Sequence, residues 1–205
     1  MSTFRFAIMG AGNIAHQFCD AVTLVEDCEV SAIASKDLGR AQKFAEECSV
    51  AHAYDNYEQM LIEEKPDCVY IAVTPNDHFR LTMLCLEHRV PVLCEKAMFT
   101  NSAEAKAVFE KAEKDQTFVM EAMWSRFLPA VNQAKKWAAE GKIGRLEALQ
   151  GRIGFLAPEG ADNRYHSPLL CGGAATDITV YAYEIATWLV NEPVRKTYAA
   201  ANLDQ

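Results

Sequence analysis

The chain opens with the stretch FRFAIMGAGNIA, residues 4–15, in which an apolar run leads into two closely spaced glycines. The spacing of Gly10, Gly12 and Ala15 matches the pattern G-x-G-x-x-G/A, which joins a strand to a helix through a tight turn in dinucleotide-binding domains. Gly10 permits the turn, Gly12 lets a pyrophosphate approach the backbone, and Ala15 lets the helix pack closely on the strand. The stretch therefore predicts nucleotide binding.

The helix that follows the glycines supplies the other part of this predicted site. Its first N–H groups, at Asn13 and Ile14, have no partner inside the helix and carry the positive end of its dipole. Such a terminus attracts phosphate groups. Because glycine pairs also end ordinary strands, the motif depends on this context of strand, turn and helix.

Composition limits the kind of protein. The chain has 205 residues, of which 50% are hydrophobic and 23% charged, as in globular proteins of one large or two small domains. No apolar run is long enough to cross a bilayer, and no secretory signal is evident at the N-terminus, so we expect a cytoplasmic protein. The seven cysteines are scattered with no C-x-x-C pair, which indicates reduced thiols and no zinc site. A net charge of −8 argues against nucleic acid as a partner.

Apolar strands and amphipathic helices alternate through the first part of the chain. The predicted strands are residues 4–9, 29–35, 51–53, 68–73, 90–94 and 117–121. The predicted helices are residues 15–25, 37–48, 56–64, 77–88 and one that starts at Ser102. This alternation predicts an α/β fold, a doubly wound parallel Rossmann sheet, in a domain that covers residues 1–121.

The pattern changes after residue 121. We expect a helix over residues 129–140, a long strand over 146–155, a loop over 157–173, an apolar helix over 174–190 and a strand over 195–201. Residues 122–205 therefore indicate the start of a second, substrate-binding domain.

Ligands of open α/β sheets bind beyond the carboxyl ends of the strands, so the residues that follow each strand are candidates. Ser35 and Lys36 follow the second strand, and Arg40 lies one helical turn further on. A hydroxyl beside two cations suits a 2′-phosphate and favours NADP. The alternatives are solvated charges at a helix start, or a ribose contact from Asp37 that would suit NAD.

The loop after the fourth strand contains Thr74, Asn76, Asp77 and His78. It is expected to lie against the nicotinamide half of the cofactor, and Asn76 or Asp77 to cap the next helix. His78 is either a catalytic base or a structural histidine.

A charged pair, Glu95 and Lys96, follows the fifth strand directly. A lysine held partly out of water there suits proton transfer to or from a carbinol oxygen. Glu95 could orient this lysine or hold a ribose hydroxyl.

Further candidates lie beyond the sixth strand. Trp124 and Arg126 are candidate cofactor contacts, the alternatives being an aromatic plug and a salt bridge at the domain junction. Asp177 and Tyr181 are four residues apart after a glycine pair, so one helix face would carry both as a proton relay or hydroxyl clamp. The alternative is a dipole partner and a core ring.

Taken together, these motifs resemble the family of glucose–fructose oxidoreductase and inositol dehydrogenase (Gfo/Idh/MocA). The resemblance rests on the glycine stretch 10–15, on Glu95 and Lys96, and on residues 172–181; residues 121–130 are most similar to its dimeric dihydrodiol dehydrogenase branch. It implies NAD(P)-dependent oxidation of a sugar, polyol or trans-dihydrodiol. Lys96 would be the acid/base or orienting lysine, with Asp177 and Tyr181 on the substrate hydroxyls.

Two departures from the family accompany this resemblance. Ala97 stands where a proline usually follows the Glu-Lys pair, and the chain stops at Gln205. Family members usually continue into an open, mostly antiparallel sheet that forms the floor of the substrate site and the subunit interface. We therefore expect a fragment or a truncated product of a protein that forms homo-oligomers. Two other functions remain: an aldose or imine reductase of the same fold, and a non-catalytic nicotinamide-binding or sensor protein.

Overall fold

The computed structural model describes residues 3–160, 163–198 and 200. Contacts group the chain into two compact units, residues 1–122 with 157–177 and residues 123–156 with 178–205. Within the described part of the chain, no helix combines the length and the apolar composition needed to span a membrane.

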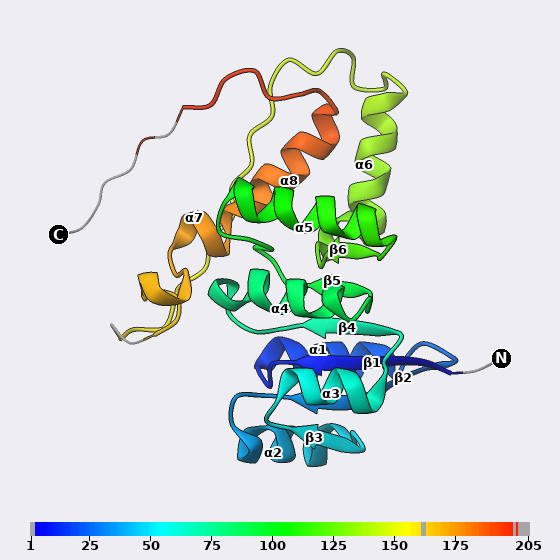
Figure 1. Ribbon diagram of the computed structural model, residues 1–205. Helices are drawn as coiled ribbons and strands as arrows, with labels where there is room; N and C mark the ends of the chain where they lie inside the picture. Colours follow the sequence, from blue (N-terminus) through cyan, green and yellow to red (C-terminus); the bar gives the residue numbers. More distant parts are fainter. Residues whose placement is uncertain (1–2, 161–162, 199, 201–205) are drawn as a thin grey trace. The chain divides into compact units, whose positions relative to one another are not determined.

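The first unit contains a six-stranded parallel sheet (Figure 1). Its strands are β1 (Phe4–Met9), β2 (Cys28–Ala34), β3 (His52–Tyr54), β4 (Cys68–Ile71), β5 (Val92–Cys94) and β6 (Val119–Glu121). Their spatial order is β3-β2-β1-β4-β5-β6, with every neighbouring pair parallel. This confirms the predicted Rossmann sheet, and it places the reversal of strand order between β1 and β4, where such folds bind ligands.

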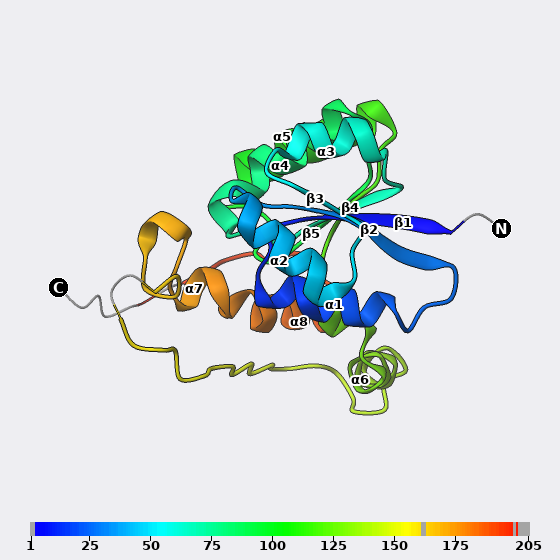
Figure 2. The same ribbon diagram turned by 90° about the horizontal axis from the view of Figure 1, so that it is seen from below.

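Helices cover both faces of this sheet. They are α1 (Asn13–Val22), α2 (Leu38–Cys48), α3 (Tyr57–Glu64), α4 (Pro75–Glu87) and α5 (Ser102–Asp115). Figure 2 shows α1 and α2 below the sheet and α3, α4 and α5 above it.

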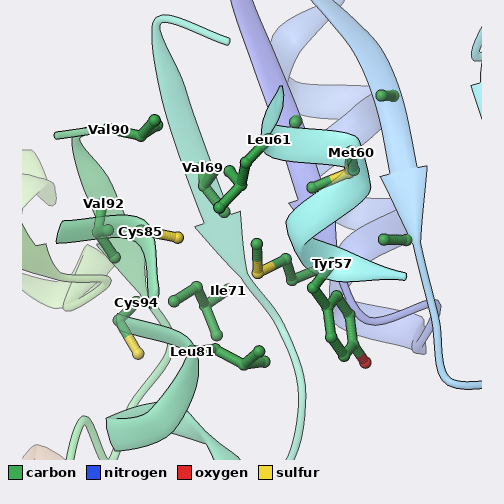
Figure 3. Packing of buried hydrophobic residues seen from close by; sticks show 14 of the residues in the cluster. Tyr57, Met60, Leu61, Val69, Ile71, Leu81, Cys85, Val90, Val92 and Cys94 are labelled. Atoms are coloured by element: carbon green, nitrogen blue, oxygen red, sulfur yellow. The ribbon is translucent and has the colours of Figure 1, made fainter. Parts of the chain in front are cut away.

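The strands are buried on both faces, as their unbroken apolar runs predict. Successive side chains of β1 alternate between two cores: Met9 packs under α3 and α4, whereas Ile8 packs against α1 and α2. Figure 3 shows the first of these cores, where Leu61 of α3 lies beside Val69 of β4.

Side-chain caps fix the start of three helices. Asp37 accepts a hydrogen bond from the Arg40 N–H at 2.8 Å, and Asn56 and Asn101 cap α3 and α5 in the same way. The predicted cap of α4 was wrong. That helix begins at Pro75 with Thr74 as the N-cap, so Asn76 and Asp77 lie within its first turn. Proline is favoured there because its missing N–H has no helical partner to lose.

Where the structure describes the chain, the remaining elements after β6 are all helices, three of them with four residues or fewer. They are η1 (Trp124–Phe127), α6 (Pro129–Ala139), η2 (Pro168–Leu170), α7 (Ala174–Asp177) and α8 (Thr179–Val190). The predicted strand over residues 146–155 was wrong, because that segment is irregular. Residues 195–198 and 200 of the last predicted strand are irregular too, while 199 and 201 lie outside the described residues. A strand needs a paired neighbour for its backbone groups, and neither segment has one among the described residues.

Candidate functional site

The glycine turn between β1 and α1 has the geometry of a phosphate cradle. Gly10 has φ +108°, and a Cβ there would lie 2.7 Å from the Ala72 carbonyl oxygen, so only glycine fits. At Gly12 a Cβ would meet nothing closer than 3.9 Å. No side chain caps α1 and its first turn holds no acid, so the N–H groups at Asn13 and Ile14 face an uncapped terminus. These residues fit a dinucleotide pyrophosphate.

The residues after β2 are arranged around the start of α2. Ser35 is buried, and its main-chain N–H donates to Tyr54 at 3.0 Å. The Arg40 guanidinium reaches the glycine turn, where it donates to the Ala11 carbonyl oxygen at 3.3 Å. Asp37 uses its carboxylate to cap α2. Arg40 therefore lies beside the glycine turn, while Asp37, the nearby acid, is engaged as a helix cap.

Lys36 forms an ion pair that sequence reasoning did not foresee. Its ammonium contacts the Asp77 carboxylate at 2.5 Å, which joins the end of β2 to the first turn of α4. Burial alone would raise the pKa of Asp77, but the hydrogen bond and charge of Lys36, with a contribution from Arg80, hold it below its usual value. The carboxylate is thus ionised at neutral pH.

The surroundings of His78 fit the structural alternative. Its ring is fully buried, Nε2 lies 3.0 Å from the Val73 carbonyl oxygen, and Nδ1 lies 3.0 Å from that of Ala97 and 3.2 Å from that of Met98. Burial lowers the pKa of His78 below its ordinary value. Because both ring nitrogens face main-chain carbonyls, this geometry favours a structural role over that of a base or a cofactor contact. Thr74, the N-cap of α4, is half-buried, and Asn76 in the first turn of that helix is exposed.

The Glu95 carboxylate accepts two hydrogen bonds from neighbouring residues. One carboxylate oxygen accepts a hydrogen bond from the Tyr70 hydroxyl at 2.6 Å, and the other accepts from the main-chain N–H of Lys96 at 3.2 Å. Burial raises the pKa of Glu95 above its usual value. These contacts suit the predicted orienting role better than a ribose contact.

Within the first unit, the Lys96 side chain contacts Asp177. Its ammonium donates to the Asp177 main-chain carbonyl oxygen at 2.6 Å and to the carboxylate at 3.1 Å. Both side chains are mostly out of water, with 14% and 13% of their surface exposed. Arg164, which sequence reasoning missed, contacts the same carboxylate at 3.4 Å. One largely covered carboxylate therefore contacts two cations, Lys96 and Arg164, beyond the carboxyl end of β5.

Asp177 and Tyr181 do not share one continuous helix as predicted. The helix expected over residues 174–190 is divided at Ile178, whose φ of −123° is not helical. Asp177 ends α7, and Tyr181 lies in α8. A spacing of four residues places two side chains on one face only while the helix is continuous.

In the second unit, Tyr181 contacts Trp124. The indole N–H donates to the Tyr181 hydroxyl at 3.0 Å, and the two rings meet edge to face with centroids 6.0 Å apart. Arg126 forms an ion pair with Glu184, a residue that sequence reasoning also missed. The available signal was a single charged residue inside the apolar helix that begins at Thr179.

The sheet order and the glycine cradle define a dinucleotide-binding Rossmann domain, and comparison with known proteins identifies its family. Residues 4–123 match the model of the oxidoreductase family with an NAD-binding Rossmann fold (GFO/IDH/MocA), and residues 131–205 match the GFO/IDH/MocA C-terminal domain. The chain therefore belongs to the GFO/IDH/MocA oxidoreductase family. The resemblance inferred from the motifs is confirmed.

Individual relatives agree with this assignment. The chain is 32% identical over 190 residues to trans-1,2-dihydrobenzene-1,2-diol dehydrogenase of Mus musculus, a match that covers 90% of this chain and 56% of the relative. Among solved structures, an NAD-binding protein from Listeria innocua has a TM-score of 0.82 at 22% identity, over 93% of this chain and 56% of that one. A 3-ketoreductase from Actinomadura kijaniata, in complex with TDP-benzene and NADP, has a TM-score of 0.65 at 26% identity, over 70% and 44%. The chain spans about half the length of the curated relatives it matches.

Proposed function

We propose that this chain carries the cofactor half and the start of the substrate half of an NAD(P)-dependent dehydrogenase. The reaction would transfer a hydride between nicotinamide and the carbinol carbon of a sugar, polyol or trans-dihydrodiol. The observation that carries the proposal is the Lys96–Asp177 pair, because it sets an oriented ammonium at the ligand edge of a nucleotide-binding sheet.

The protein's part in this reaction is to hold the hydroxyl group and move its proton. A bound nicotinamide would supply or accept the hydride. Lys96 would hold the substrate oxygen and exchange its proton, and Asp177 would keep the ammonium in place. Tyr181 is the second candidate for the substrate hydroxyls. Arg164 would add positive charge beside the developing oxyanion.

Support for the cofactor site comes from the cradle and the residues around it. Gly10, Gly12, Asn13 and Ile14 would hold the pyrophosphate, while Thr74 and Asn76 would lie near the nicotinamide half. Trp124, Arg126 and Glu95 have protein partners in the structure. We assign Glu95 to orienting Lys96, and Trp124 and Arg126 to holding η1 on α8.

NADP is the cofactor we favour over NAD. Arg40 lies beside the glycine turn and would give a 2′-phosphate a cation. Lys36 follows Ser35 directly, and its ammonium pairs with Asp77. The acid that could bind a free ribose hydroxyl, Asp37, is engaged as a helix cap. The 3-ketoreductase from Actinomadura kijaniata is in complex with NADP and GenD2 from gentamicin A biosynthesis with NAD, so both coenzymes occur among similar structures.

We further propose a division of labour along the chain. Residues 1–121 would bind the cofactor, and residues 122–205 would begin the domain that holds the substrate and joins subunits into a homo-oligomer. The match to the C-terminal family model over residues 131–205 supports this division.

Coenzyme titration and a substrate screen test the proposal. We expect tighter binding of NADPH than of NADH, and hydride transfer with at least one polyol, aldose or trans-dihydrodiol. Turnover confined to reduction of aldoses or imines would indicate a reductase of the same fold. Tight NADPH binding without turnover on any of these substrates would indicate a non-catalytic nicotinamide-binding protein and overturn the proposed reaction.

A further inference from the structure

The short helix η1 lies along one face of α8 within the second unit. Positions 181, 184 and 188 of α8 are separated by three and four residues, so their side chains share that face. The contacts are Trp124 with Tyr181, Ser125 with Glu184, and Arg126 with both Glu184 and Trp188. Three consecutive residues of η1 are thereby matched to successive positions along one side of α8.

Glu184 is the anchor of this arrangement. Its side chain is only 9% exposed, and its carboxylate accepts hydrogen bonds from the Ser125 hydroxyl at 3.0 Å and from the Arg126 Nε. A carboxylate that leaves water needs charged and hydrogen-bonding partners. Both partners come from η1, and Ser125 is itself buried. The position of η1 on α8 therefore depends on Glu184.

The placement of η1 also determines where Trp124 lies, because Trp124 precedes Ser125 in that helix. Trp124 is 57% exposed, so burial in a core does not fix its ring. Its partner is the Tyr181 hydroxyl, to which the indole N–H donates at 3.0 Å. An indole nitrogen can only donate, so this bond occupies an acceptor position of the phenol oxygen and limits the directions left to the O–H group.

We propose that Glu184 is a positioning residue for Tyr181. It holds η1 in register on α8, so that the Trp124 indole fixes the Tyr181 hydroxyl toward a substrate. Glu184 acts through Ser125, Arg126 and Trp124. The inference rests on the proposed function only in giving Tyr181 a substrate hydroxyl to contact.

Glu184→Gln is the principal variant, because glutamine keeps the size of the side chain and loses its charge. Ser125→Ala is a milder variant that removes one anchor and leaves the ion pair with Arg126. The matched control is Glu192→Gln, an exposed glutamate just beyond α8. Each variant is measured for kcat, for NADPH affinity and for the indole N–H resonance of Trp124, which Trp124→Phe assigns.

We expect Glu184→Gln to lower kcat about tenfold, which corresponds to roughly 1.4 kcal/mol, with NADPH affinity unchanged. Trp124→Phe should cause a similar loss, and the double variant should be no worse than Trp124→Phe alone, since residues that act in series are not additive. The Trp124 resonance should move in Glu184→Gln and in Tyr181→Phe, and stay in place in Glu192→Gln.

Several outcomes would overturn the inference. One is a fall in the free energy of unfolding with kcat and the Trp124 resonance unchanged; another is an additive loss in the double variant. A Tyr181→Phe protein with full kcat, beside a defective Glu184→Gln, would show that Glu184 acts elsewhere. If the unaltered protein shows no hydride transfer, the proposed function fails. The Trp124 resonance then tests the positioning role of Glu184 by itself, and a resonance that does not move in Glu184→Gln overturns that role.

Discussion

The ammonium of Lys96 donates to two oxygens of Asp177, the main-chain carbonyl at 2.6 Å and the carboxylate at 3.1 Å, although 81 residues separate the two in sequence. The carbonyl contact depends on backbone position, and the carboxylate contact on the side chain. The last turn of α7 therefore sets the direction of the ammonium in two ways. A substitution of Lys96 therefore removes both contacts, whereas a substitution of the Asp177 side chain removes only the carboxylate contact.

Lys96→Met should abolish proton transfer without disturbing coenzyme binding. We expect kcat to fall by about 10²–10⁴-fold, the usual contribution of general acid–base catalysis, with NADPH affinity within about twofold of the unaltered protein. Asp177→Asn keeps the carbonyl contact and should lose less, about tenfold. Steady-state kinetics and NADPH titration check both, with Lys111→Met on α5 as the control. An equal loss of turnover and NADPH affinity in Lys96→Met would contradict the assignment.

Gly10 and Gly12 should respond differently to alanine. At Gly10 the added methyl would lie 2.7 Å from the Ala72 carbonyl oxygen at φ +108°, so we expect Gly10→Ala to lower the free energy of unfolding by about 1–3 kcal/mol. At Gly12 the nearest atom is 3.9 Å away, so Gly12→Ala should fold normally and lose at least about tenfold in coenzyme affinity, because the methyl enters the phosphate cradle. Urea denaturation and NADPH titration separate the two effects. Normal coenzyme affinity in Gly12→Ala would argue against the cradle.

The sequence predicted the first part of the fold well because its information there is local. Unbroken apolar runs such as residues 68–73 mark buried parallel strands, and the turn at Gly10 and Gly12 follows from backbone freedom alone. The contacts of Lys36 with Asp77 and of Arg164 with Asp177 could not be predicted, because each joins segments whose approach depends on tertiary packing. The strand predicted over residues 146–155 was wrong because local sequence cannot show whether a pairing partner is present.

Arg40→Met should weaken NADPH binding selectively. A charge-assisted hydrogen bond contributes about 1.5–3 kcal/mol, so loss of a 2′-phosphate contact should cost roughly 10–100-fold in NADPH affinity and leave NADH affinity nearly unchanged. Lys43→Met is the control, because Lys43 lies on the same helix and pairs with Glu47 at its exposed surface. Fluorescence titration with the two coenzymes gives the ratio. Equal weakening of NADH would indicate that Arg40 supports the turn rather than the phosphate.

His78 should make the stability of the protein fall in mild acid. Burial lowers its pKa in the folded state below the ordinary value of 6.5, so the unfolded chain binds the proton more readily than the native protein. Its contribution to stability is complete above about pH 6.5 and is lost as pH falls through the lower folded value. We expect the free energy of unfolding to drop between pH 7.5 and pH 5.5, and to drop less in His78→Gln, which has no group that titrates.

The comparison uses the difference between the two pH values within each variant, so a general loss of stability in His78→Gln does not affect it. Urea denaturation measures that difference, with His166→Gln on an exposed loop as the matched control. If His78→Gln keeps the full pH dependence of the unaltered protein, the buried ring between Val73 and Ala97 is not its source.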